Sequence, residues 1–458
     1  MTIHRIARRA RAGVGLAAVL LLPLAACDTD EILDVTDPDI INPSDVKSAA
    51  AADALRIGAL ARFNTATSGG ASGSEGFWLL GGMLTDEWRS GDTFVQRNDW
   101  DRRSTLDTDN LLNTAYRNAH RARLSAQQAV AALTEWEAPA WHVAQMYFVQ
   151  AYSENMLAEA LCSGLIFSTV VDGEPQYGSP VTTIEAYERA LAHADSGLAL
   201  AVGATADDEA IRNALAVIKG RILLNLDRYG DAAAAVAAVP TSDTWMNEHA
   251  QTTTLNTMWA LNNSAGRYIL GNGEGTNGID FVGANDPRVP GCAAATAGCN
   301  PGGASANFDP AATAAGVPLF VQKIWPTRES AAAVVTGVEA RLIEAEAVLR
   351  SNPAQWLAIH NDLRATVPGL TPLADPPSEE ERISTHFRER AMWMFGTGTR
   401  LGDLRRLIRQ YGRDAESVFP TGIWFKASTP YGTDVNFPIP QNEENNPNFG
   451  NGCLDRNA

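Results

Sequence analysis

Alanine-rich amphipathic runs that recur as helix–turn–helix pairs constrain this chain more than any other feature of its sequence. In the clearest pair, 209–238, one run ends at Leu226, a turn follows at 227–231, and an alanine-rich run begins. Small alanine side chains let two antiparallel helices approach closely, as in a tetratricopeptide-type unit. The sequence therefore predicts an all-α-dominated fold built on helical hairpins. A generic bundle of hairpins is the alternative, because no strict repeat of about 34 residues is found.

Further helical runs lie on both sides of this pair. Ser44 is placed to cap a first helix over 45–63. Two more hairpins are predicted, over 110–161 with a break near Ala138-Pro139 and over 338–365 with a break at Asn352-Pro353. The other runs expected up to residue 238 are 77–88, 108–134, 139–161, 183–200, 208–226 and 231–238.

Two stretches differ in character from the helical runs. Residues 241–325 are rich in Gly, Asn, Pro and Thr, and the C-terminal segment 413–458 has little helical period and several prolines. We expect irregular loops with a few short strands in the first and an irregular segment in the second. Long loops on a rigid helical frame usually carry function.

The N-terminus reads as an export signal. Four arginines precede an apolar run over 14–24, which is shorter than the roughly 20 residues that a spanning helix needs. The run ends in Leu24-Ala25-Ala26-Cys27, and small residues before a cysteine are typical of a lipoprotein cleavage site. The pattern predicts a signal peptide over 1–26, lipidation of Cys27, a polar tether over 27–44 and a single domain over 45–458. The alternative is an ordinary signal peptide in which Cys27 occurs by chance.

The mature chain is strongly acidic. The full sequence has 36 basic and 53 acidic residues and a formal charge of −17, and loss of the four signal arginines makes it −21. Such a surface repels nucleic acid, which excludes it as a partner, and it disfavours electrostatic binding to anionic lipid. The lipid anchor is then the expected contact with the membrane.

Four cysteines follow Cys27, and an exported chain favours their oxidation to disulfides. Cys292 and Cys299 bracket a Gly/Ala-rich loop and are expected to pair, which leaves Cys162 and Cys453 as the second pair. The connectivity itself stays open at this stage. No C-x-x-C pair occurs and no histidine lies nearby, so neither a metal site nor a cofactor is expected.

Aromatic residues in polar sequence mark the candidate binding segment. The chain has 11 tryptophans, and several aromatic residues lie among charged neighbours between residues 86 and 100. An aromatic face stacks on the apolar face of a sugar ring, while neighbouring polar side chains bind its hydroxyls or a peptide backbone. The alternative is that these rings fill the gap between loops and frame. The predicted ligand-binding residues are Asp86, Trp88, Arg89, Phe94, Arg97 and Trp100.

A charged cluster near the C-terminus allows two interpretations. Arg400 and Asp403 are three residues apart, so they share a helix face and are placed to pair with each other. Arg405 and Arg406 follow, which makes an anion site conceivable. We expect instead an interior ion-pair lock that ties this helix to its neighbours.

A series of short motifs runs through the chain. The most specific is Arg388-Glu389-Arg390 followed by Gly398-Thr399-Arg400-Leu401-Gly402-Asp403-Leu404-Arg405-Arg406. The others are Leu33-Asp34-Val35 with Asp37-Pro38, Leu84-Thr85-Asp86-Glu87, Asp286-Pro287-Arg288, Val321-Gln322-Lys323, Glu339-Ala340-Arg341-Leu342-Ile343-Glu344-Ala345-Glu346-Ala347, Asn361-Asp362-Leu363-Arg364 and Phe437-Pro438-Ile439-Pro440. In order and spacing they resemble the SusD/RagB family of nutrient-binding outer-membrane lipoproteins. The chain resembles a divergent member, since Thr397 stands where the family usually has Glu.

The resemblance implies a fold and a role. The fold would be a frame of about four tetratricopeptide-like units with a loop-rich face. The protein would be lipid-anchored in the outer membrane and exposed at the cell surface. It would bind glycans or oligopeptides, deliver them to a SusC-like TonB-dependent transporter, and catalyse no reaction.

Two other functions remain open from the sequence. A surface glycoside hydrolase would need two carboxylates from the loops, and Asp86 and Glu87 are adjacent, so their side chains point apart. Neither H-E-x-x-H nor G-x-S-x-G occurs. A tetratricopeptide-type scaffold that binds only protein is the second alternative.

Overall fold

The computed structural model describes residues 46–70, 74–171, 174–299, 309–450 and 452–458. The chain divides into two compact units, 1–41 and 42–458, and the second contains all of these residues. The predicted signal peptide, Cys27, the tether and Ser44 lie outside the described residues and stay predictions.

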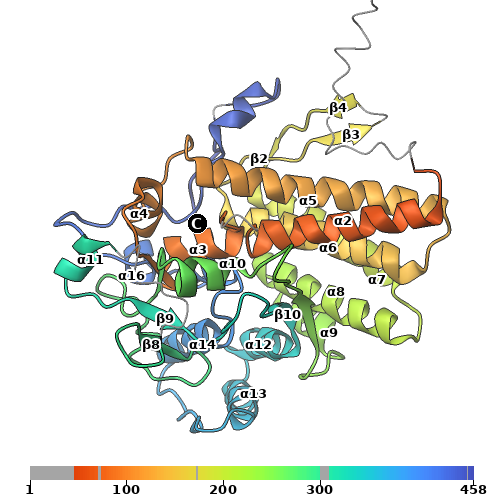
Figure 1. The fold of residues 1–458 in the computed structure, drawn as a ribbon. Coiled ribbons are helices and arrows are strands. Elements are labelled where there is room, and N and C mark those ends of the chain that lie inside the picture. The colour runs from red at the N-terminus through yellow and green to blue at the C-terminus, as the bar shows by residue number, and fades with distance from the viewer. Residues whose placement is uncertain (1–45, 71–73, 172–173, 300–308, 451) are drawn as a thin grey trace, which may run out of the picture. The chain divides into compact units, whose positions relative to one another are not determined.

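Long helices packed side by side form the frame of the second unit (Figure 1). Each helix from α5 to α9 packs against the next, α12 packs on α8, α9 and α13, and α2 packs on α5 and α6. The predicted hairpins are present as α5–α6, α8–α9 and α12–α13, so the tetratricopeptide-like helical fold is confirmed. The helices of the frame are α2 (Ala49–Thr67), α5 (Asn110–Glu135), α6 (Ala140–Ala160), α7 (Thr183–Leu200), α8 (Ala206–Asn225), α9 (Tyr229–Val236), α12 (Gly337–Val348) and α13 (Pro353–Ala365).

Local sequence sets where these helices begin. Thr182 and Thr205 open α7 and α8 with capping boxes, in which each threonine hydroxyl accepts a backbone N–H of the first turn and an acidic side chain of that turn accepts the threonine N–H. Asn352 caps α13 and Pro353 occupies its first turn, as the predicted break requires. The cap of α2 is Ser48 rather than Ser44, so the first helix begins later than the sequence suggested.

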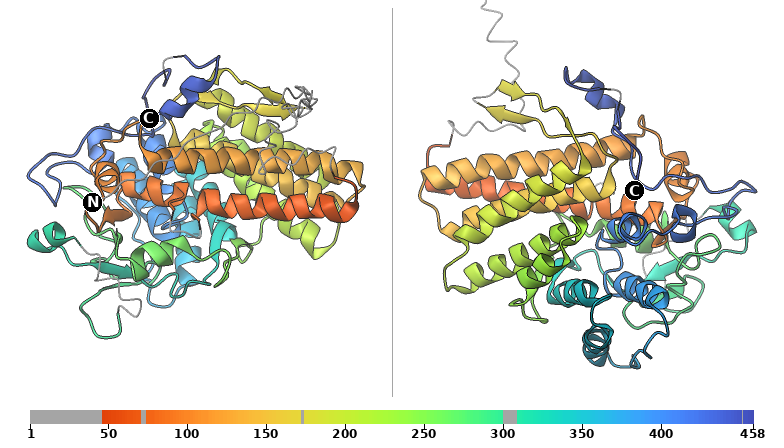
Figure 2. Two further views of the ribbon diagram at one scale, coloured as in Figure 1. Left: turned by 45° about the horizontal axis from the view of Figure 1, so that its top comes forward. Right: turned by 180° about the vertical axis from the view of Figure 1, so that it is seen from behind.

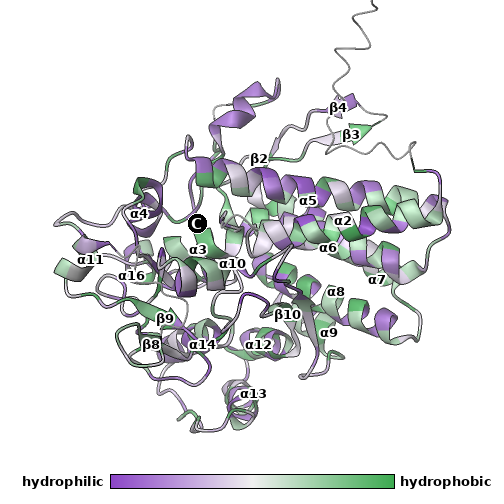
Figure 3. Cartoon of the chain, viewed as in Figure 1, coloured by the Kyte–Doolittle hydropathy of each residue, from purple (hydrophilic) through white to green (hydrophobic). Residues whose placement is uncertain are grey.

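Small residues allow the helices of the frame to approach closely. A Cβ on Gly220 of α8 would lie 2.5 Å from the Val236 Cγ1 of α9, so this contact needs glycine. Along α5, apolar and polar residues alternate in the hydropathy colouring of Figure 3. Its fully buried face is built largely from Ala119, Ala122, Ala126, Ala129 and Ala132. The alanine pattern therefore reports helix packing, as predicted.

A face of short elements covers one side of this frame (Figure 2). Together with a strand pair that lies above α5 in Figure 1, its strands form five two-stranded antiparallel sheets among the described residues. The described residues of 241–325 contain short strands and short helical turns joined by irregular segments. The strands are β1 (Trp88–Ser90), β2 (Leu165–Ile166), β3 (Thr169–Val171), β4 (Glu174–Gln176), β5 (Pro180–Val181), β6 (Thr244–Asn247), β7 (Tyr268–Leu270), β8 (Gly291–Ala293), β9 (Phe320–Gln322) and β10 (Ala332–Thr336).

Shorter helices complete this face. The helical run expected over 77–88 ends earlier, at Leu84, and the polar segment after it contains the strand β1 and the helix α4. In 413–458 the helical elements of the described residues are α16 and a single 3-10 turn. These helices are α3 (Phe77–Leu84), α4 (Val95–Asp101), α10 (Thr257–Trp259), a π-helical turn (Ala260–Ser264), α11 (Pro310–Ala314), α14 (Glu379–Trp393), α15 (Arg400–Arg409), α16 (Ala415–Val418) and a 3-10 turn (Gln441–Asn445).

Both predicted disulfides are present. Cys292 pairs with Cys299 within the loop that they bracket, and Cys162 pairs with Cys453 across a sequence separation of 291 residues. The second bond joins the end of α6 to the C-terminal segment. The backbone N–H of Cys162 also donates to the carbonyl of Phe437 at 2.8 Å. The irregular C-terminus is therefore fixed to the frame. No helix in the described ranges has the length and apolar character needed to cross a membrane.

Candidate ligand-binding site

Pairing of β1 with β7 brings distant segments together on the irregular face. The strands are antiparallel, with Trp88 opposite Leu270 and Ser90 opposite Tyr268. The pairing continues past the strand end, where the N–H of Gly91 donates to the carbonyl of Arg267 at 2.7 Å. The turn between β1 and α4 is therefore held against residue 267, and a Cβ on Gly91 would meet the Gly266 carbonyl oxygen at 2.3 Å.

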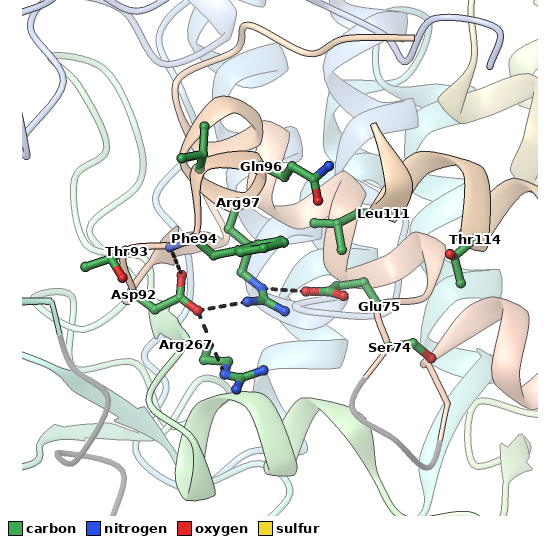
Figure 4. A pocket seen from close by; sticks show the side chains of 11 residues that line it. Ser74, Glu75, Asp92, Thr93, Phe94, Gln96, Arg97, Leu111, Thr114 and Arg267 are labelled. Carbon is green, nitrogen blue, oxygen red and sulfur yellow. Dashed lines mark hydrogen bonds and ion pairs between the residues drawn. The ribbon is translucent and has the colours of Figure 1, made fainter. Parts of the chain in front are cut away.

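An open cavity of about 720 Å³ lies beside this turn. Its volume is within the range of roughly 300–1,000 Å³ that small-molecule sites occupy. Figure 4 shows its side chains converging from the turn before α4, from α4 itself and from the start of α5. The lining residues are Ser74, Glu75, Asp92, Thr93, Phe94, Val95, Gln96, Arg97, Leu111, Thr114 and Arg267.

A buried ion-pair cluster forms the floor of the cavity. The Nε of Arg97 donates to Oε1 of Glu75 at 2.5 Å, and its Nη1 donates to Oδ2 of Asp92 at 2.8 Å. Burial lowers the pKa of Arg97, but the charges of Glu75, the Tyr268 hydroxyl and Asp92 outweigh it and raise this pKa overall. The guanidinium is therefore a fixed cation, and both carboxylates are oriented by it.

An exposed aromatic ring lies over this cation. The Phe94 side chain is 45% exposed, and the guanidinium carbon of Arg97 lies 5.0 Å from its ring centroid. The Phe94 backbone N–H donates to Oδ1 of Asp92 at 3.0 Å, which fixes the turn that presents the ring. Val95 is also exposed, and Leu111 is partly exposed across the cavity. The site therefore combines an apolar platform with charged hydrogen-bonding groups.

Two of the six predicted site residues line this cavity, namely Phe94 and Arg97. Trp88 and Trp100 are fully buried, with 0% of their surface exposed. The Trp100 ring packs edge-on against Phe437, and its indole N–H donates to Oδ2 of Asp109 at 2.7 Å. These two tryptophans fit the alternative interpretation, in which the rings fill the gap between the loops and the frame.

The other two predicted residues, Asp86 and Arg89, make contacts in the interior of the fold. Asp86 accepts two bonds from Arg400, at 2.7 and 2.8 Å. Arg89 is buried, donates to the carbonyls of Asn272 and Gly273, and pairs with Glu274. Both are committed to interior contacts, so neither is available to a ligand in this cavity.

The sequence interpretation missed the three other charged residues of the site. Asp92 lies inside the segment that was singled out, and Glu75 lies just before α3, outside that segment. Arg267 is a partly exposed residue whose Nε lies 3.9 Å from Oδ2 of Asp92. The β1–β7 pairing places Arg267 beside Asp92, and no local pattern in the sequence predicts that pairing.

Within the described ranges, no group of three or more His, Cys, Asp or Glu side chains is arranged to hold a metal ion.

No protein-family model matches the sequence, and no curated protein matches it. Solved structures do match it in three dimensions. A SusD superfamily protein from Parabacteroides distasonis superposes with a TM-score of 0.64 at 14% identity, covering 87% of this chain and 98% of that one.

Two further structures match in the same way. A SusD-like carbohydrate-binding protein from Bacteroides vulgatus gives a TM-score of 0.58 at 14% identity, covering 78% of this chain and 83% of that one. A laminarin-binding SusD-like protein gives 0.58 at 13% identity, covering 89% and 99%. The chain has the SusD fold. The fold implied by the motif resemblance is thereby confirmed.

Three of the motifs that carry the SusD resemblance, over 339–347, 388–390 and 398–406, contribute buried ion pairs and do not line the cavity. Glu346 of α12 pairs with Arg406 of α15 at 2.9 Å, and Asp403 pairs with Arg390 and Arg406, both at 2.9 Å. Glu339 pairs with Arg221 at 2.6 Å. All of these side chains are buried. These three motifs therefore specify interior contacts of the fold and not contacts in the cavity.

The expected interior lock around Arg400 is confirmed, but with different partners. Arg400 pairs with Asp86 from the segment before β1, and not with Asp403. Arg405 donates to the carbonyls of Ala158, Glu159 and Leu161 at 3.0, 2.7 and 2.9 Å, so it satisfies the C-terminal end of α6. Spacing alone identified the lock but could not identify residues from remote segments.

Glu87 is a fully buried carboxyl group next to this lock. Its Oε1 accepts the Gly396 N–H at 2.9 Å, while its Oε2 is buried without a hydrogen-bond partner. Burial raises its pKa from the ordinary 4.5 to about 8, against the smaller lowering effects of Gly396 and Arg400. Glu87 is therefore protonated in the folded chain at neutral pH.

This raised pKa predicts a pH-dependent stability. Between about 4.5 and 8 the folded chain keeps a proton that the unfolded chain loses, so stability falls as pH rises through this window. We expect Glu87→Gln to have nearly the wild-type free energy of unfolding near about pH 5 and to exceed it by about 4 kcal/mol near about pH 8.5. Urea unfolding at both pH values measures this, with the exposed Glu188→Gln as control. A constant difference at the two pH values would contradict it.

Proposed function

We propose that this protein is a SusD/RagB-type lipoprotein that captures glycans at the cell surface. The observation that supports this most is the open cavity in which Phe94 lies over the paired guanidinium of Arg97. An aromatic platform flanked by carboxylate, guanidinium and amide groups is the set of contacts that sugar recognition uses. The fold is shared with structures described as carbohydrate-binding and laminarin-binding.

The cavity suits cargo that must be released. Its walls are preformed, because the turn before α4 is held by hydrogen bonds at Asp92 and Gly91. Its open form leaves much of a bound molecule in water, which limits affinity. Modest affinity fits delivery to a SusC-like TonB-dependent transporter, which we propose as the partner. Oligopeptides would use the same polar groups, but the exposed ring favours glycans.

We further propose that the protein is held in the outer membrane through Cys27 and faces the cell exterior. The support is the lipoprotein signal pattern at 1–27 together with the acidic charge of the mature chain. Acyl chains would then supply the membrane attachment, since an acidic surface gains nothing from anionic headgroups.

Binding without turnover fits the cavity better than glycoside hydrolysis. Its two buried carboxylates, Glu75 and Asp92, both hydrogen-bond the same guanidinium. Both carboxylates are therefore already bonded to Arg97, whereas a glycosidase needs two carboxyl groups that are free to act on either side of the scissile bond.

Calorimetry on the purified mature protein tests the proposal. Laminarin, other oligosaccharides and oligopeptides are titrated into wild type, into Phe94→Ala and into Tyr177→Ala, an exposed aromatic control that does not line this cavity. We expect a glycan to bind wild type and the control, and Phe94→Ala to bind it about tenfold or more weakly, from the loss of ring contact of about 1.5–3 kcal/mol. Absence of glycan binding, or equal affinity in all three, would refute the proposal.

A further inference from the structure

Arg267 is the exposed charged residue of the binding cavity. Its side chain is 43% exposed, whereas the side chain of Asp92 is 11% exposed and those of Glu75 and Arg97 are buried. Among the described residues that line the cavity, these four carry the charged side chains. A bound molecule therefore meets one formal charge that is open to water, and that charge is positive.

The two carboxylates of the cavity are bonded to other partners. Glu75 and Asp92 accept from the Nε and Nη1 of Arg97 at 2.5 and 2.8 Å, and Asp92 also accepts the Phe94 N–H. The Nε of Arg267 lies 3.9 Å from Oδ2 of Asp92, which is beyond hydrogen-bond distance. Figure 4 shows this loose pair below the tight pairs of Arg97. The guanidinium of Arg267 is therefore much less committed to protein partners than that of Arg97.

The exposed cation and the exposed ring lie on neighbouring parts of the cavity. The carbonyl of Arg267 accepts the Gly91 N–H at 2.7 Å, so its backbone is fixed against the turn before α4. Oδ2 of Asp92 contacts both guanidinium groups, and the guanidinium carbon of Arg97 lies 5.0 Å from the ring centroid of Phe94. A ligand that covers the ring is therefore close to Arg267.

The charges around the cavity differ from those of the chain as a whole. The full sequence has a formal charge of −17, so most of its surface disfavours anions. The described lining of the cavity holds two carboxylates and two guanidinium groups, so its formal charge is zero. Its negative charges are the more buried ones, and the well-exposed charge is positive. An anionic group is therefore not repelled from this cavity as strongly as from the acidic surface.

We propose that Arg267 selects glycans that carry carboxylate groups, which means chains with uronic acid units. The inference rests on the proposed function, because it takes Phe94 as the platform for the sugar ring. A carboxylate of the stacked unit or of the next one would pair with Arg267, since a planar guanidinium offers two N–H groups to the two oxygens. The competing role for Arg267 is to balance the carboxylates of the cavity, and that role predicts no preference for acidic glycans.

An acidic oligosaccharide and its methyl ester make a matched pair of probes, because the ester keeps the sugar ring and removes the charge. Oligogalacturonate, oligoglucuronate and oligomannuronate are titrated into the mature protein by calorimetry, each beside its ester. Laminarin-derived oligosaccharides are the neutral probe, and an oligopeptide rich in acidic residues supplies carboxylate from another source.

Three variants and one control complete the experiment. Arg267→Gln removes the charge, Arg267→Lys keeps the charge without the planar pair of donors, and Phe94→Ala removes the ring. Arg228→Gln is the matched control, since the Arg228 side chain is 46% exposed, pairs with Asp231 at 2.7 Å and does not line the cavity.

The expected result is a preference for the acid that depends on Arg267. Wild type and Arg228→Gln should bind at least one oligouronate about tenfold or more tightly than its ester at low salt. This ratio should fall as ionic strength rises, because salt screens an exposed charge. Arg267→Gln should bind acid and ester alike, with the wild-type affinity for the ester, and Arg267→Lys should lie between. Phe94→Ala should weaken both forms. A purely structural role for Arg267 would change neither the acid-to-ester ratio nor its dependence on salt.

Three results would overturn the selection of acidic glycans. One is that wild type binds neutral oligosaccharides but no oligouronate more tightly than its ester. Another is that Arg267→Gln keeps the full preference for the acid. The third is that the acidic oligopeptide binds through Arg267 while no oligouronate does, which would assign this cation to peptide cargo. If wild type binds no oligosaccharide of any kind, the proposed function itself fails, and the binding of neutral glycans distinguishes that failure from the first result.

Discussion

Glu346→Gln is expected to lower the free energy of unfolding by about 3–5 kcal/mol. The carboxylate of Glu346 is buried among Arg406 at 2.9 Å, the His386 Nε2 at 3.3 Å and the Tyr411 hydroxyl at 3.2 Å. Burial alone raises its pKa, but the charge of Arg406 and the hydrogen bond from His386 lower it well below the usual range. The ionised form is therefore built into the fold.

The cost arises from the cations that the substitution leaves behind. Glu346 and Asp403 together balance Arg390 and Arg406, and all four side chains are almost fully buried. Glutamine keeps the volume and removes the charge, so two guanidinium groups would share one carboxylate. Removing one partner of a buried pair is far more costly than the pair's net contribution to stability, because an uncompensated buried charge remains.

A neighbouring glutamate on the same helix provides the control. Glu344 is only partly buried and pairs with Arg341 at 3.1 Å within α12. Glu344→Gln is expected to change the free energy of unfolding by less than about 1 kcal/mol. Denaturant unfolding of both variants at neutral pH makes the comparison. If Glu346→Gln proved as mild as Glu344→Gln, the buried network would not stabilise the fold in the way described.

The helical frame was the part most open to prediction from sequence. The alanine spacing of α5 and the breaks at Pro139 and Pro353 act locally, through capping and close helix packing, so they can be interpreted without a structure. The lock around Arg400 was only half accessible. Its burial was foreseen, but its partner Asp86 lies 314 residues away in sequence. Helical spacing carries no information about such a contact.

Only two of the residues that line the candidate cavity could be anticipated from the sequence, for a related reason. Phe94 and Arg97 were identified because an aromatic ring among polar residues is uncommon in a core. The same reasoning failed for Trp88 and Trp100, since charged residues near them are themselves buried in pairs: Arg97 pairs with Asp92 at 2.8 Å, for example. Polar sequence does not mean exposure where carboxylates and guanidinium groups satisfy one another inside the fold. Only tertiary pairing reveals which rings face solvent.

Trp100→Ala and Phe94→Ala are expected to separate stability from binding. Trp100 is fully buried, donates to Asp109 at the start of α5 and lies with its ring centroid 4.4 Å from that of Phe437. Its truncation should lower the free energy of unfolding by about 3–5 kcal/mol, through lost contacts and the cavity left behind. Phe94 is 45% exposed, so its truncation should change stability by only about 0.5 kcal/mol.

The binding measurements should reverse this order. Phe94→Ala should lose most of its glycan affinity while staying fully folded. Trp100→Ala, assayed at low temperature where it remains folded, should keep an affinity within about threefold of wild type, because its ring contacts Phe437 and not the cavity. Loss of binding by Trp100→Ala with unchanged stability would return both tryptophans to the role of ligand platforms. In that case, the exposure of each ring to solvent would not identify the aromatic residues that bind the ligand.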